Sequence, residues 1–464
     1  MKLPGFIDSH LHVLGLGYVS YNVDLTEIKS IEELKEKLDK FKDRGIIIGR
    51  GWNQENFTEK RMITKCDLNE ISKDIPIVMT RVCGHVLTVN EKMLELAGID
   101  KFTQQVSGGS FSYETGIFTE HALGLIYDKM PLPTEADLVK YLLTADKILI
   151  ENGITSVASD DFAIFPLPYE QIINTIKKLY EQNLLHIKIT EQVNLGYKRL
   201  KDFISKGYVN KSFGKYRMGP LKILVDGSLG GKTAKLSQPY EGEPSNTGIA
   251  TYTDDELFDL VYLADSNGMD VVIHAIGDAA SLQAIKALMN SLEITKRKDH
   301  HHAIIHAQLT NLEQIAMMKE WNIGAIVQPI FLNSDIQIIE SRIGSRQKES
   351  YLFKTMYDIG LTVGFSTDAP IEPVNPFLNI YSAMTRTSIK NPDLGVFLEK
   401  EKFEYDEALE CYYKNNLRFI YQDLLSSDDY IIVDRPFSGS ESLLKMKVVK
   451  TVIDGETVFD AMKE

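Results

Sequence analysis

Short apolar runs recur along this chain, separated by segments in which polar and apolar residues follow a different period. Eight of the runs have the length and composition of buried strands, at residues 6–12, 154–160, 186–193, 221–226, 271–276, 303–307, 324–330 and 361–367. Most of the intervening segments have apolar residues at helical spacing, at 134–151, 170–183, 254–267, 279–293 and 311–321. Several of these predicted helices end near a glycine that precedes the next strand, for example Gly153 and Gly268.

Strands that are apolar on both faces and alternate with helices are typical of a parallel sheet. Eight such units predict an α/β protein with a (β/α)8 TIM barrel, which we expect to span residues 5–425. An open, doubly wound sheet is the structural alternative.

The regular spacing breaks between the first strand and residue 154, where the gap is far longer than one βα unit needs. Residues 45–125 contain strand-like runs, a helical segment and a glycine-rich turn of their own. We interpret this stretch as a large insertion over the barrel mouth, because no flexible linker marks it as a separate domain. After a predicted helix at 405–424, strand-like runs predict that residues 426–464, with 1–4, form a small, reduced β appendage.

Composition and charge narrow the partners and the compartment. The hydrophobic content of 44% and the charged content of 25% are those of a globular protein. The net charge of −14 argues against a nucleic-acid partner, because phosphate binding needs clustered lysine and arginine. No apolar run approaches the ~18 residues of a membrane span, and the first residues enter a strand without room for a signal peptide. Cys66, Cys83 and Cys411 are too widely spaced for a metal or disulfide pattern, so we expect a cytoplasmic protein.

The first predicted strand ends in two histidines, His10 and His12, separated by one residue. Side chains alternate along a strand, so both imidazoles point to the same face, roughly 7 Å apart along the chain. Two imidazoles at this spacing can bind one metal ion. They lie at the carboxyl end of the strand, where parallel α/β enzymes keep their chemistry.

Further strands carry groups able to join such a site. His274, His306 and Asp368 lie at the ends of apolar runs, and Lys222 lies inside one. A bare ammonium is costly to bury, and carboxylation by carbon dioxide would convert Lys222 into a carbamate able to bridge two metals. Singly, each group has an ordinary interpretation, as a hydrogen-bonded core histidine, a lysine whose head lies in a loop, or a helix-capping aspartate. Their coincidence at the strand ends of one barrel points to a metal site.

The remaining histidines lack such a pattern. His300, His301 and His302 form a polar run before a strand, which predicts that they are solvated or lie behind the ligands. His121 and His186 have no partner by spacing, so we interpret them as structural.

A resemblance to a known family rests on six segments taken in order. They are PGFIDSHLH, LKILVDGSLGGKTA, VVIHAIGDAA, IIHAQL, VQP and FSTDAP. Together they resemble the YtcJ-like branch of the amidohydrolase superfamily, across residues 4–376 and more weakly to the C-terminus. The resemblance implies a binuclear site for two divalent ions, zinc first, with iron, manganese and nickel as alternatives. It implies as ligands His10, His12, His274, His306 and Asp368, with Lys222 as the carboxylated, bridging lysine.

Parts of the insertion also resemble this branch, at 51–53, 81–85, 90, 108–109 and 115–120. The resemblance places His85 over the substrate, as a catalytic and substrate-binding group, with Trp52 as an apolar wall. In the plain alternative His85 only caps a turn. Asp226 and Lys232 would lie behind the ligands or anchor the substrate, and a purely structural role is the alternative.

The chain departs from the family in two respects. The family usually opens with half of a β-sandwich before the first barrel strand, and this chain lacks it. We therefore expect the appendage to be reduced or completed by another subunit, which points to a homodimer. Ile305 and Lys232 stand where the family often has an acidic residue and an arginine, which bears on substrate contacts and not on the ligands.

A divalent metal lowers the pKa of its bound water to about 7 and so supplies hydroxide at neutral pH. In the predicted site this hydroxide attacks a carbonyl, and Asp368 takes the proton and passes it to the leaving nitrogen. We therefore predict hydrolysis of a C–N bond in a small molecule: a linear or cyclic amide, an N-acyl or an N-formyl compound. One alternative is a mononuclear deaminase, although Gly277 stands where such enzymes often carry a glutamate. The other is a catalytically silent ligand-binding or regulatory protein on the same fold.

Overall fold

The chain forms two compact units, each with its own sheet and apolar core. The structure is a computed structural model that describes residues 1–81, 84–106, 108–421 and 428–463. One unit comprises Met1–Gly17 and Glu135–Glu464, and the other comprises Tyr18–Thr134. The second unit contains the predicted insertion 45–125 and extends beyond it on both sides. Whether it covers the barrel mouth stays a prediction.

Eight parallel strands among the described residues form the barrel of the first unit. They are β2 (Phe6–Leu11), β9 (Ile154–Ser159), β10 (Lys188–Val193), β12 (Tyr216–Leu224), β13 (Val271–Ala275), β14 (Ala303–His306), β15 (Gly324–Val327) and β16 (Val363–Phe365). Each pairs in parallel with its neighbour in that order, and β11 (Ser212–Phe213) adds an antiparallel pair to β12. All eight predicted strands are present, and the predicted barrel fold is confirmed.

Side-chain and backbone bonds bring the first and last strands together, so the barrel is nearly closed. The Asn416 amide donates to the carbonyl of Ile7 in β2, at 2.6 Å, and to that of Phe365 in β16, at 2.7 Å. Beyond the strand ends, the Asp368 backbone N–H donates to the carbonyl of His10 at 3.0 Å. The far ends of the chain are thus joined where two of the predicted ligands lie.

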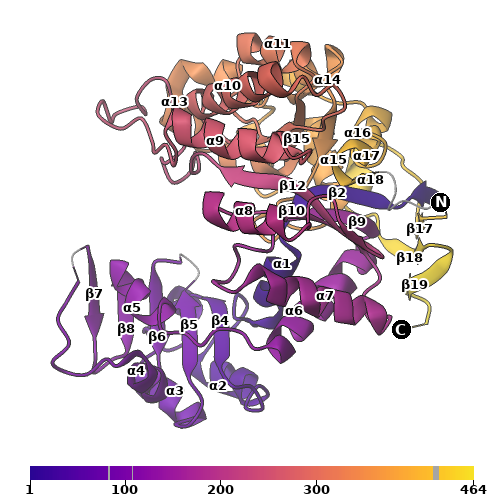
Figure 1. The fold of residues 1–464 in the computed structure, drawn as a ribbon. Coiled ribbons are helices and arrows are strands. Elements are labelled where there is room, and N and C mark those ends of the chain that lie inside the picture. The colour runs from indigo at the N-terminus through magenta and orange to yellow at the C-terminus, as the bar shows by residue number, and fades with distance from the viewer. Residues whose placement is uncertain (82–83, 107, 422–427, 464) are drawn as a thin grey trace. The chain divides into compact units, whose positions relative to one another are not determined.

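Helices alternate with the strands and cover the outside of the barrel. The longer ones are α6 (Glu135–Glu151), α7 (Tyr169–Glu181), α8 (Tyr197–Ser205), α9 (Asp254–Asp265), α10 (Asp278–Thr295), α11 (Leu312–Glu320) and α15 (Pro376–Thr385). In Figure 1, α6 lies near β9. Helix α10 packs against β13 and β14. Thr253 and Glu256 form a capping box that begins α9, and Gly153 and Gly268 follow helices with φ of 75° and 74°. No helix of the described residues has the length and apolar character to cross a membrane.

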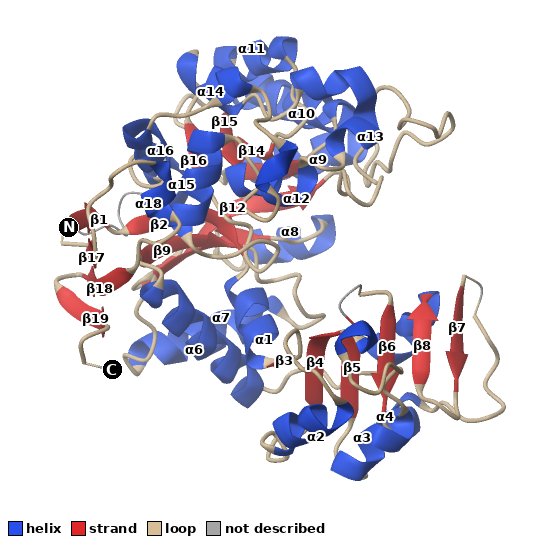
Figure 2. Ribbon diagram, turned by 180° about the vertical axis from the view of Figure 1, so that it is seen from behind, coloured by secondary structure: helices blue, strands red, loops and turns tan. Residues whose placement is uncertain are grey.

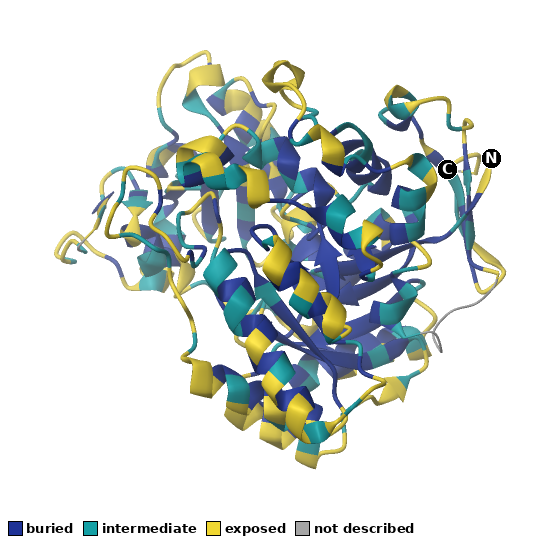
Figure 3. Cartoon of the chain, turned by 90° about the horizontal axis from the view of Figure 1, so that it is seen from above, coloured by how far each residue is buried: buried dark blue, intermediate teal, exposed yellow. Residues whose placement is uncertain are grey.

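The barrel strands are buried, and a short helix fills the barrel floor. Figure 3 shows most of the barrel strands dark blue and most of the exposed residues on outer helix faces and in loops. Phe419 of α17 (Leu417–Ile420) packs with a cluster made by β13, β14 and β15, namely Val272, Ala303, Ile305 and Ile326. Ile420 packs with Ile7 and Ala158 of β2 and β9. This apolar core lies inside the barrel, and the predicted polar ligands lie at or near the carboxyl ends of its strands.

The predicted helix at 405–424 is wrong in its continuity. The structure has α16 (Tyr405–Cys411), then turns at 412–416, then α17, and residues 422–424 lie outside the described part. The break carries Asn415 and Asn416 toward the barrel, where Asn415 donates to the carbonyl of Val363 at 3.0 Å. These tertiary bonds replace helical ones and have no local signature. The remaining short helices are α1 (Val13–Tyr21), α12 (Leu332–Asp335), α13 (Ile339–Ile343), α14 (Phe353–Asp358) and α18 (Ser440–Leu443).

The two ends of the chain form one small antiparallel sheet. Its order is β1 (Lys2–Pro4), β17 (Tyr430–Val433), β18 (Val448–Ile453) and β19 (Glu456–Asp460). Lys188 of β10 ties the sheet to the barrel, because its buried ammonium lies 2.7 Å from both Asp429 and Asp454. The predicted homodimer stays a prediction.

The unit Tyr18–Thr134 is built around a six-stranded mixed sheet (Figure 2). Its order is β3 (Val23–Asp24), β4 (Ile47–Trp52), β5 (Ile77–Arg81), β6 (Val86–Val89), β8 (Ile117–Glu120) and β7 (Gly109–Ser112). Its helices are α2 (Ile31–Asp39), α3 (Lys65–Ile71), α4 (Glu91–Ala97) and α5 (Gly124–Tyr127). Cys66 and Cys411 are free cysteines, and Cys83 lies outside the described residues.

Candidate metal centre

The predicted ligands lie on five of the barrel strands, at or near their carboxyl ends. His10 lies in β2, Lys222 in β12, His274 in β13 and His306 at the end of β14, while His12 and Asp368 follow β2 and β16. The parallel register places Leu224 opposite His274 and Ala275 opposite His306. Successive strands therefore present their polar groups at the same end of the barrel.

These side chains converge on a common point. His10, His306 and Asp368 are buried, and their ligand atoms lie within 4.8 Å of one another. Asp368 Oδ1 is 3.3 Å from Nε2 of His10 and 3.1 Å from Nε2 of His12. The His274 and His306 rings are 4.4 Å apart between centroids. Four imidazoles and one carboxylate thus gather at one end of the barrel.

The backbone is held in the left-handed region at two of these residues. The φ angle is 73° at His306 and 56° at Asp368. A residue other than glycine pays on the order of 1–3 kcal/mol for such a conformation. The Ala307 N–H, bonded to the carbonyl of Ala275 at 3.1 Å, holds the first turn in place. Strain of this kind is concentrated at functional sites, where the surroundings fix a side chain in one direction.

Three of the imidazoles have Nδ1 against an oxygen of the protein. Nδ1 is 2.7 Å from Gln192 Oε1 in His10, 2.7 Å from Gln328 Oε1 in His306, and 2.8 Å from the Asp160 carbonyl in His12. A carbonyl or amide oxygen only accepts, so Nδ1 carries the proton. Nε2 of each ring is then the nitrogen that can bind a metal.

The fourth imidazole is held the opposite way round. His274 Nε2 is 3.1 Å from the carbonyl of Gly227 and 3.5 Å from Oδ1 of Asp226. The proton therefore lies on Nε2, and Nδ1 is left as the ligand atom. A Cβ at position 227 would lie 2.1 Å from Thr233 Oγ1, so only glycine fits at the residue that supplies this carbonyl.

Burial keeps three of the imidazoles neutral, the form that binds metal. Burial, helped by Lys222, lowers the pKa of His10 to about 4 and that of His274 to about 3. Burial also lowers the pKa of His306 well below its usual value. For Asp368, burial acts to raise the pKa, but the adjacent imidazoles of His10 and His12 outweigh it and hold the pKa well below the usual range.

His12 differs, because its hydrogen bond to Asp368 outweighs burial and raises its pKa to about 9. Without a metal, His12 and Asp368 therefore form a charged pair, and a cation bound there would replace the proton. The donor set of neutral imidazoles around one ionised carboxylate fits a divalent metal such as zinc.

Lys222 lies within the same group. Its Nζ is 3.1 Å from Nε2 of His10 and 3.9 Å from Oδ2 of Asp160, and its residue is 2% exposed. Burial lowers the pKa of this amine. Asp160 was not among the predicted site residues, although it is the last residue of the predicted strand 154–160. It is buried, and its Oδ1 has no hydrogen-bond partner.

Asp226 fixes the loops that carry the neighbouring groups. Its carboxylate accepts from the backbone N–H of Ile276 at 3.1 Å, Gly277 at 2.8 Å and Lys235 at 2.9 Å. Lys232 forms an ion pair with Glu243 within the same loop region. Asp226 therefore has a clear structural role, and a substrate contact by either residue stays a prediction.

Trp52 and His85 lie in the unit Tyr18–Thr134. Trp52 is fully buried in that unit's apolar core, where its indole N–H donates to the carbonyl of Met79 at 3.0 Å and its ring stacks on Phe57. His85 is exposed, with Nδ1 3.0 Å from Glu120. The packing gives Trp52 a core position, and the predicted substrate contacts of both residues stay predictions.

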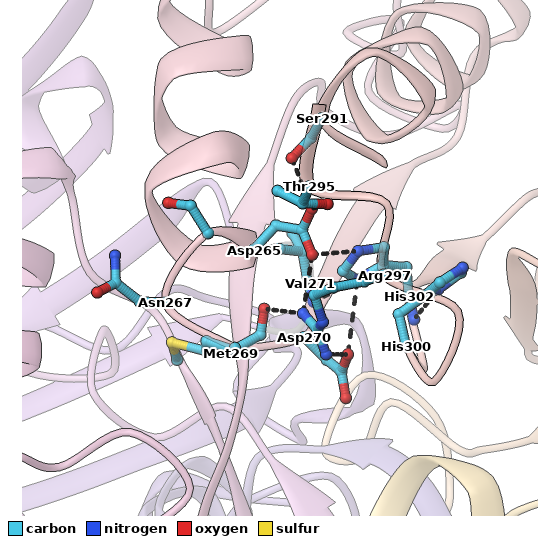
Figure 4. Close-up of polar contacts among 12 residues, drawn as sticks. Asp265, Asn267, Met269, Asp270, Val271, Ser291, Thr295, Arg297, His300 and His302 are labelled. Atoms are coloured by element: carbon cyan, nitrogen blue, oxygen red, sulfur yellow. Dashed lines mark hydrogen bonds and ion pairs between the residues drawn. The ribbon is translucent and has the colours of Figure 1, made fainter. Parts of the chain in front are cut away.

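The prediction for the run His300–His302 is wrong for His300 and His302, whereas the side chain of His301 is partly exposed. His300 and His302 are 4% and 0% exposed, and they precede β14, at the opposite end of the strand from His306. His302 accepts from the Val271 N–H at 3.0 Å through Nδ1, and its Nε2 faces Asp265 at 3.2 Å. Figure 4 shows this cluster, in which Arg297 reaches both Asp265 and Asp270.

Asp8, Gln192 and Gln328 were also missed. Asp8 accepts from His10 N–H and from both the N–H and the hydroxyl of Thr367, which ties β2 to the end of β16. All three are polar residues in or beside buried strands, the same signal that singled out Lys222.

Comparison with known proteins agrees with this fold. The sequence profile of the Amidohydrolase family matches residues 1–459, and the chain belongs to this family. The chain is 30% identical over 488 aligned positions to the Bacillus subtilis (strain 168) protein described as "Putative amidohydrolase YtcJ", covering 99% of this chain and 89% of that protein.

Two solved structures are similar over most of the chain, and both are described as uncharacterized metal-dependent hydrolases. The one from Pyrococcus horikoshii has a TM-score of 0.78 at 31% identity, covering 94% of this chain and 86% of the other. The one from Pyrococcus furiosus has a TM-score of 0.77 at 31% identity, covering 90% and 82%. Fold and family therefore define a metal-dependent hydrolase.

Proposed function

We propose that the protein hydrolyses a C–N bond in a small molecule, a linear or cyclic amide, an N-acyl or an N-formyl compound, with a pair of divalent metals. The observation that carries the proposal is the convergence of His10, His306 and Asp368, whose ligand atoms lie within 4.8 Å of one another. The family, whose name denotes amide hydrolysis, supports the choice of bond.

The metals would be held by Nε2 of His10, His12 and His306, by Nδ1 of His274 and by the carboxylate of Asp368. Bound there, they would supply hydroxide at neutral pH and polarise the substrate carbonyl. Zinc suits this mixture of imidazole and carboxylate, and iron, manganese and nickel are alternatives.

Asp368 would move the proton. The adjacent imidazoles of His10 and His12 keep the pKa of its carboxyl low, so it is ionised at neutral pH and able to accept a proton. An amide nitrogen leaves poorly unless it is protonated. Asp368 would therefore pass the proton on to the leaving nitrogen, a transfer worth about 10²–10⁴ in rate.

Lys222 would complete the site as a carbamate. Burial lowers the pKa of its amine, and a neutral amine attacks carbon dioxide to form a carbamate with release of one proton. The two carbamate oxygens would give a bridging anion beside His10, whose Nε2 lies 3.1 Å from Nζ. Asp160, 3.9 Å away, is the competing partner for an uncarboxylated Lys222 ammonium.

Elemental analysis of protein purified without chelators, with assays on a panel of N-acyl and N-formyl amides, tests the proposal. We expect about two metals per chain and hydrolysis of at least one compound. A Lys222→Ala variant should keep about one metal or none, while unchanged stoichiometry would remove Lys222 from the site. A metal-free protein that binds ligands without turnover would overturn the proposal in favour of a silent binding protein, and release of ammonia from an aminated ring would indicate the deaminase.

A further inference from the structure

We infer that Gln192 and Gln328 are positioning residues that fix two of the metal-binding imidazoles, an inference that rests on the proposed function. The two glutamines are 0% and 1% exposed. Gln192 lies in β10 and Gln328 directly follows β15. Neither strand supplies a predicted ligand, so these strands contribute through the orientation of ligands on other strands.

The orientation of the Gln192 amide follows from its partners. Its Nε2 donates to the carbonyl of Ser9 at 3.0 Å, and a carbonyl can only accept. The amide oxygen must then face Nδ1 of His10, at 2.7 Å. His10 is therefore protonated on Nδ1, and Nε2, which lies 3.3 Å from Asp368, keeps its lone pair.

Gln328 repeats this arrangement from the other side of the site. Its Nε2 donates to the Ser366 hydroxyl at 2.7 Å and toward the carbonyl of Ile326 at 3.5 Å. Its Oε1 faces Nδ1 of His306 at 2.7 Å. Two glutamines on separate strands thus impose the same tautomer and direction on two ligands.

Removal of either acceptor would have two consequences. The buried Nδ1–H would lose its partner, which favours the other tautomer, with the proton on the nitrogen that faces the metal site. The ring would also lose the bond that fixes its rotation. Both effects weaken metal binding without removing a ligand, and partners of this kind are worth about 10–100-fold in metal affinity.

Other histidines of the chain have a different type of partner. His186 Nδ1 lies 2.6 Å from a carboxylate of Asp146, and His85 Nδ1 lies 3.0 Å from Glu120. Behind His10, His12 and His306 the Nδ1 partners are uncharged amide and carbonyl oxygens. They orient the rings without placing a further negative charge behind them.

Zinc affinity, measured by competition with a chromogenic chelator, tests the inference in the full-length protein. In Gln192→Met and Gln328→Met the shape is kept and the acceptor is lost, and we expect zinc to bind about 10–100-fold more weakly. In Gln192→Glu and Gln328→Glu an acceptor oxygen remains, and most of the affinity should return.

Gln314→Met is the matched control. Gln314 is also a buried glutamine, 4% exposed, but its amide donates to the carbonyl of Asp278 and caps α11 with Asn311. Thermal unfolding of each zinc-free variant reports folding separately. Gln314→Met should lower stability and leave zinc affinity unchanged.

The outcomes separate this inference from the proposed function. A wild-type protein that binds no zinc or other divalent metal overturns the proposed function. A wild-type protein that binds zinc, with methionine variants as tight as Gln314→Met, overturns the positioning role alone. Glutamate variants as weak as the methionine variants would also contradict it, because an acceptor would then not suffice. Because the two glutamines act on different histidines, either one decides the question if the other variant fails to fold.

Discussion

Two histidine clusters lie at opposite ends of the same two strands, β13 and β14. At the carboxyl ends, His274 and His306 each have one ring nitrogen bonded to the protein, and the other nitrogen of His306 lies close to His10 and Asp368. At the start of β14, His302 has Nδ1 against the Val271 N–H and Nε2 facing Asp265. Both clusters are buried and histidine-rich, so burial and composition do not distinguish them.

The two clusters differ in the partners of their carboxylates, Asp265 in one and Asp368 in the other. Asp265 accepts from Ser291, Thr295 and Arg297, at 2.7, 2.7 and 2.8 Å, in addition to facing His302. At the upper end, Asp368 faces two imidazoles that converge on it, and Asp160 nearby keeps an unpaired oxygen. In the lower cluster, around His302, the Asp265 carboxylate has three side-chain donors, although Nε2 of His302 and Nδ1 of His301 have no hydrogen-bond partner among the described residues. We propose that the upper cluster, around Asp368, binds a cation instead. A barrel of this type keeps stability at one end and chemistry at the other.

The sharpest contrast should come from matched aspartate variants. Asp368→Asn removes the carboxylate that we propose accepts the proton, and we expect kcat to fall by about 10³. Asp265→Asn should leave kcat close to that of the wild type and instead lower the free energy of unfolding by about 3 kcal/mol, because it breaks a buried ion-pair cluster. Steady-state kinetics and denaturant unfolding of both variants measure this. Equal losses of activity would break the comparison.

Metal removal should change stability only through the cluster around Asp368, which contains His274 and His306. A ligand that binds only the folded state at 1,000 times its Kd stabilises it by about 4 kcal/mol. We therefore expect a chelator to lower the Tm and added zinc to restore it. His306→Ala should abolish the response to zinc, and His302→Ala should retain it. A zinc response that survives in His306→Ala and disappears in His302→Ala would place the metal at the wrong end.

His302→Ala should lower the free energy of unfolding, because it removes the contacts of the buried imidazole. The variant leaves the Val271 N–H unpaired and one side of Asp265 without its partner. We expect a loss of about 2 kcal/mol in the free energy of unfolding, with metal content unchanged. Urea unfolding with elemental analysis on the same sample checks both parts. A loss of metal without a loss of stability would contradict the structural role.

The smallest expected effect is the pH dependence of the lower cluster. Burial acts to raise the pKa of Asp265, but bonds from His302, Thr295 and Ser291 outweigh it and hold the pKa well below the usual value. Below about pH 4 the unfolded carboxyl binds a proton that the folded one does not, so stability falls on acidification, by at most about 1.4 kcal/mol per pH unit. Above that pH the contribution is complete. Unfolding measured from pH 5 to pH 2 should show a shallower slope in Asp265→Asn, and identical slopes would refute the assignment.

The sequence was sufficient for the barrel and for candidate ligands that the structure brings together, for one physical reason. Buried parallel strands are apolar on both faces, so a polar residue within or directly after such a strand is conspicuous. His10, His274 and His306 were found in this way. Gln192 carried the same signal, but glutamine has no strong chemical meaning by itself, and its partner His10 is 182 residues away.

The two wrong predictions concern segments whose structure depends on contacts with residues distant in the sequence. The run His300–His302 is polar and precedes a strand, which indicates exposure, yet Asp265 and Asp270 from another segment make its burial favourable. The predicted helix at 405–424 breaks because Asn416 bonds to β2 and β16. Neither partner is near in sequence, so local pattern could not reveal them.

Anomalous diffraction at the zinc absorption edge, from crystals of the protein loaded with zinc, tests the central claim most directly. We predict anomalous density for zinc about 2.0–2.2 Å from Nε2 of His10, His12 or His306, from Nδ1 of His274 and from a carboxylate oxygen of Asp368. An upper cluster without density, or density confined to His302 and Asp265, would contradict the account.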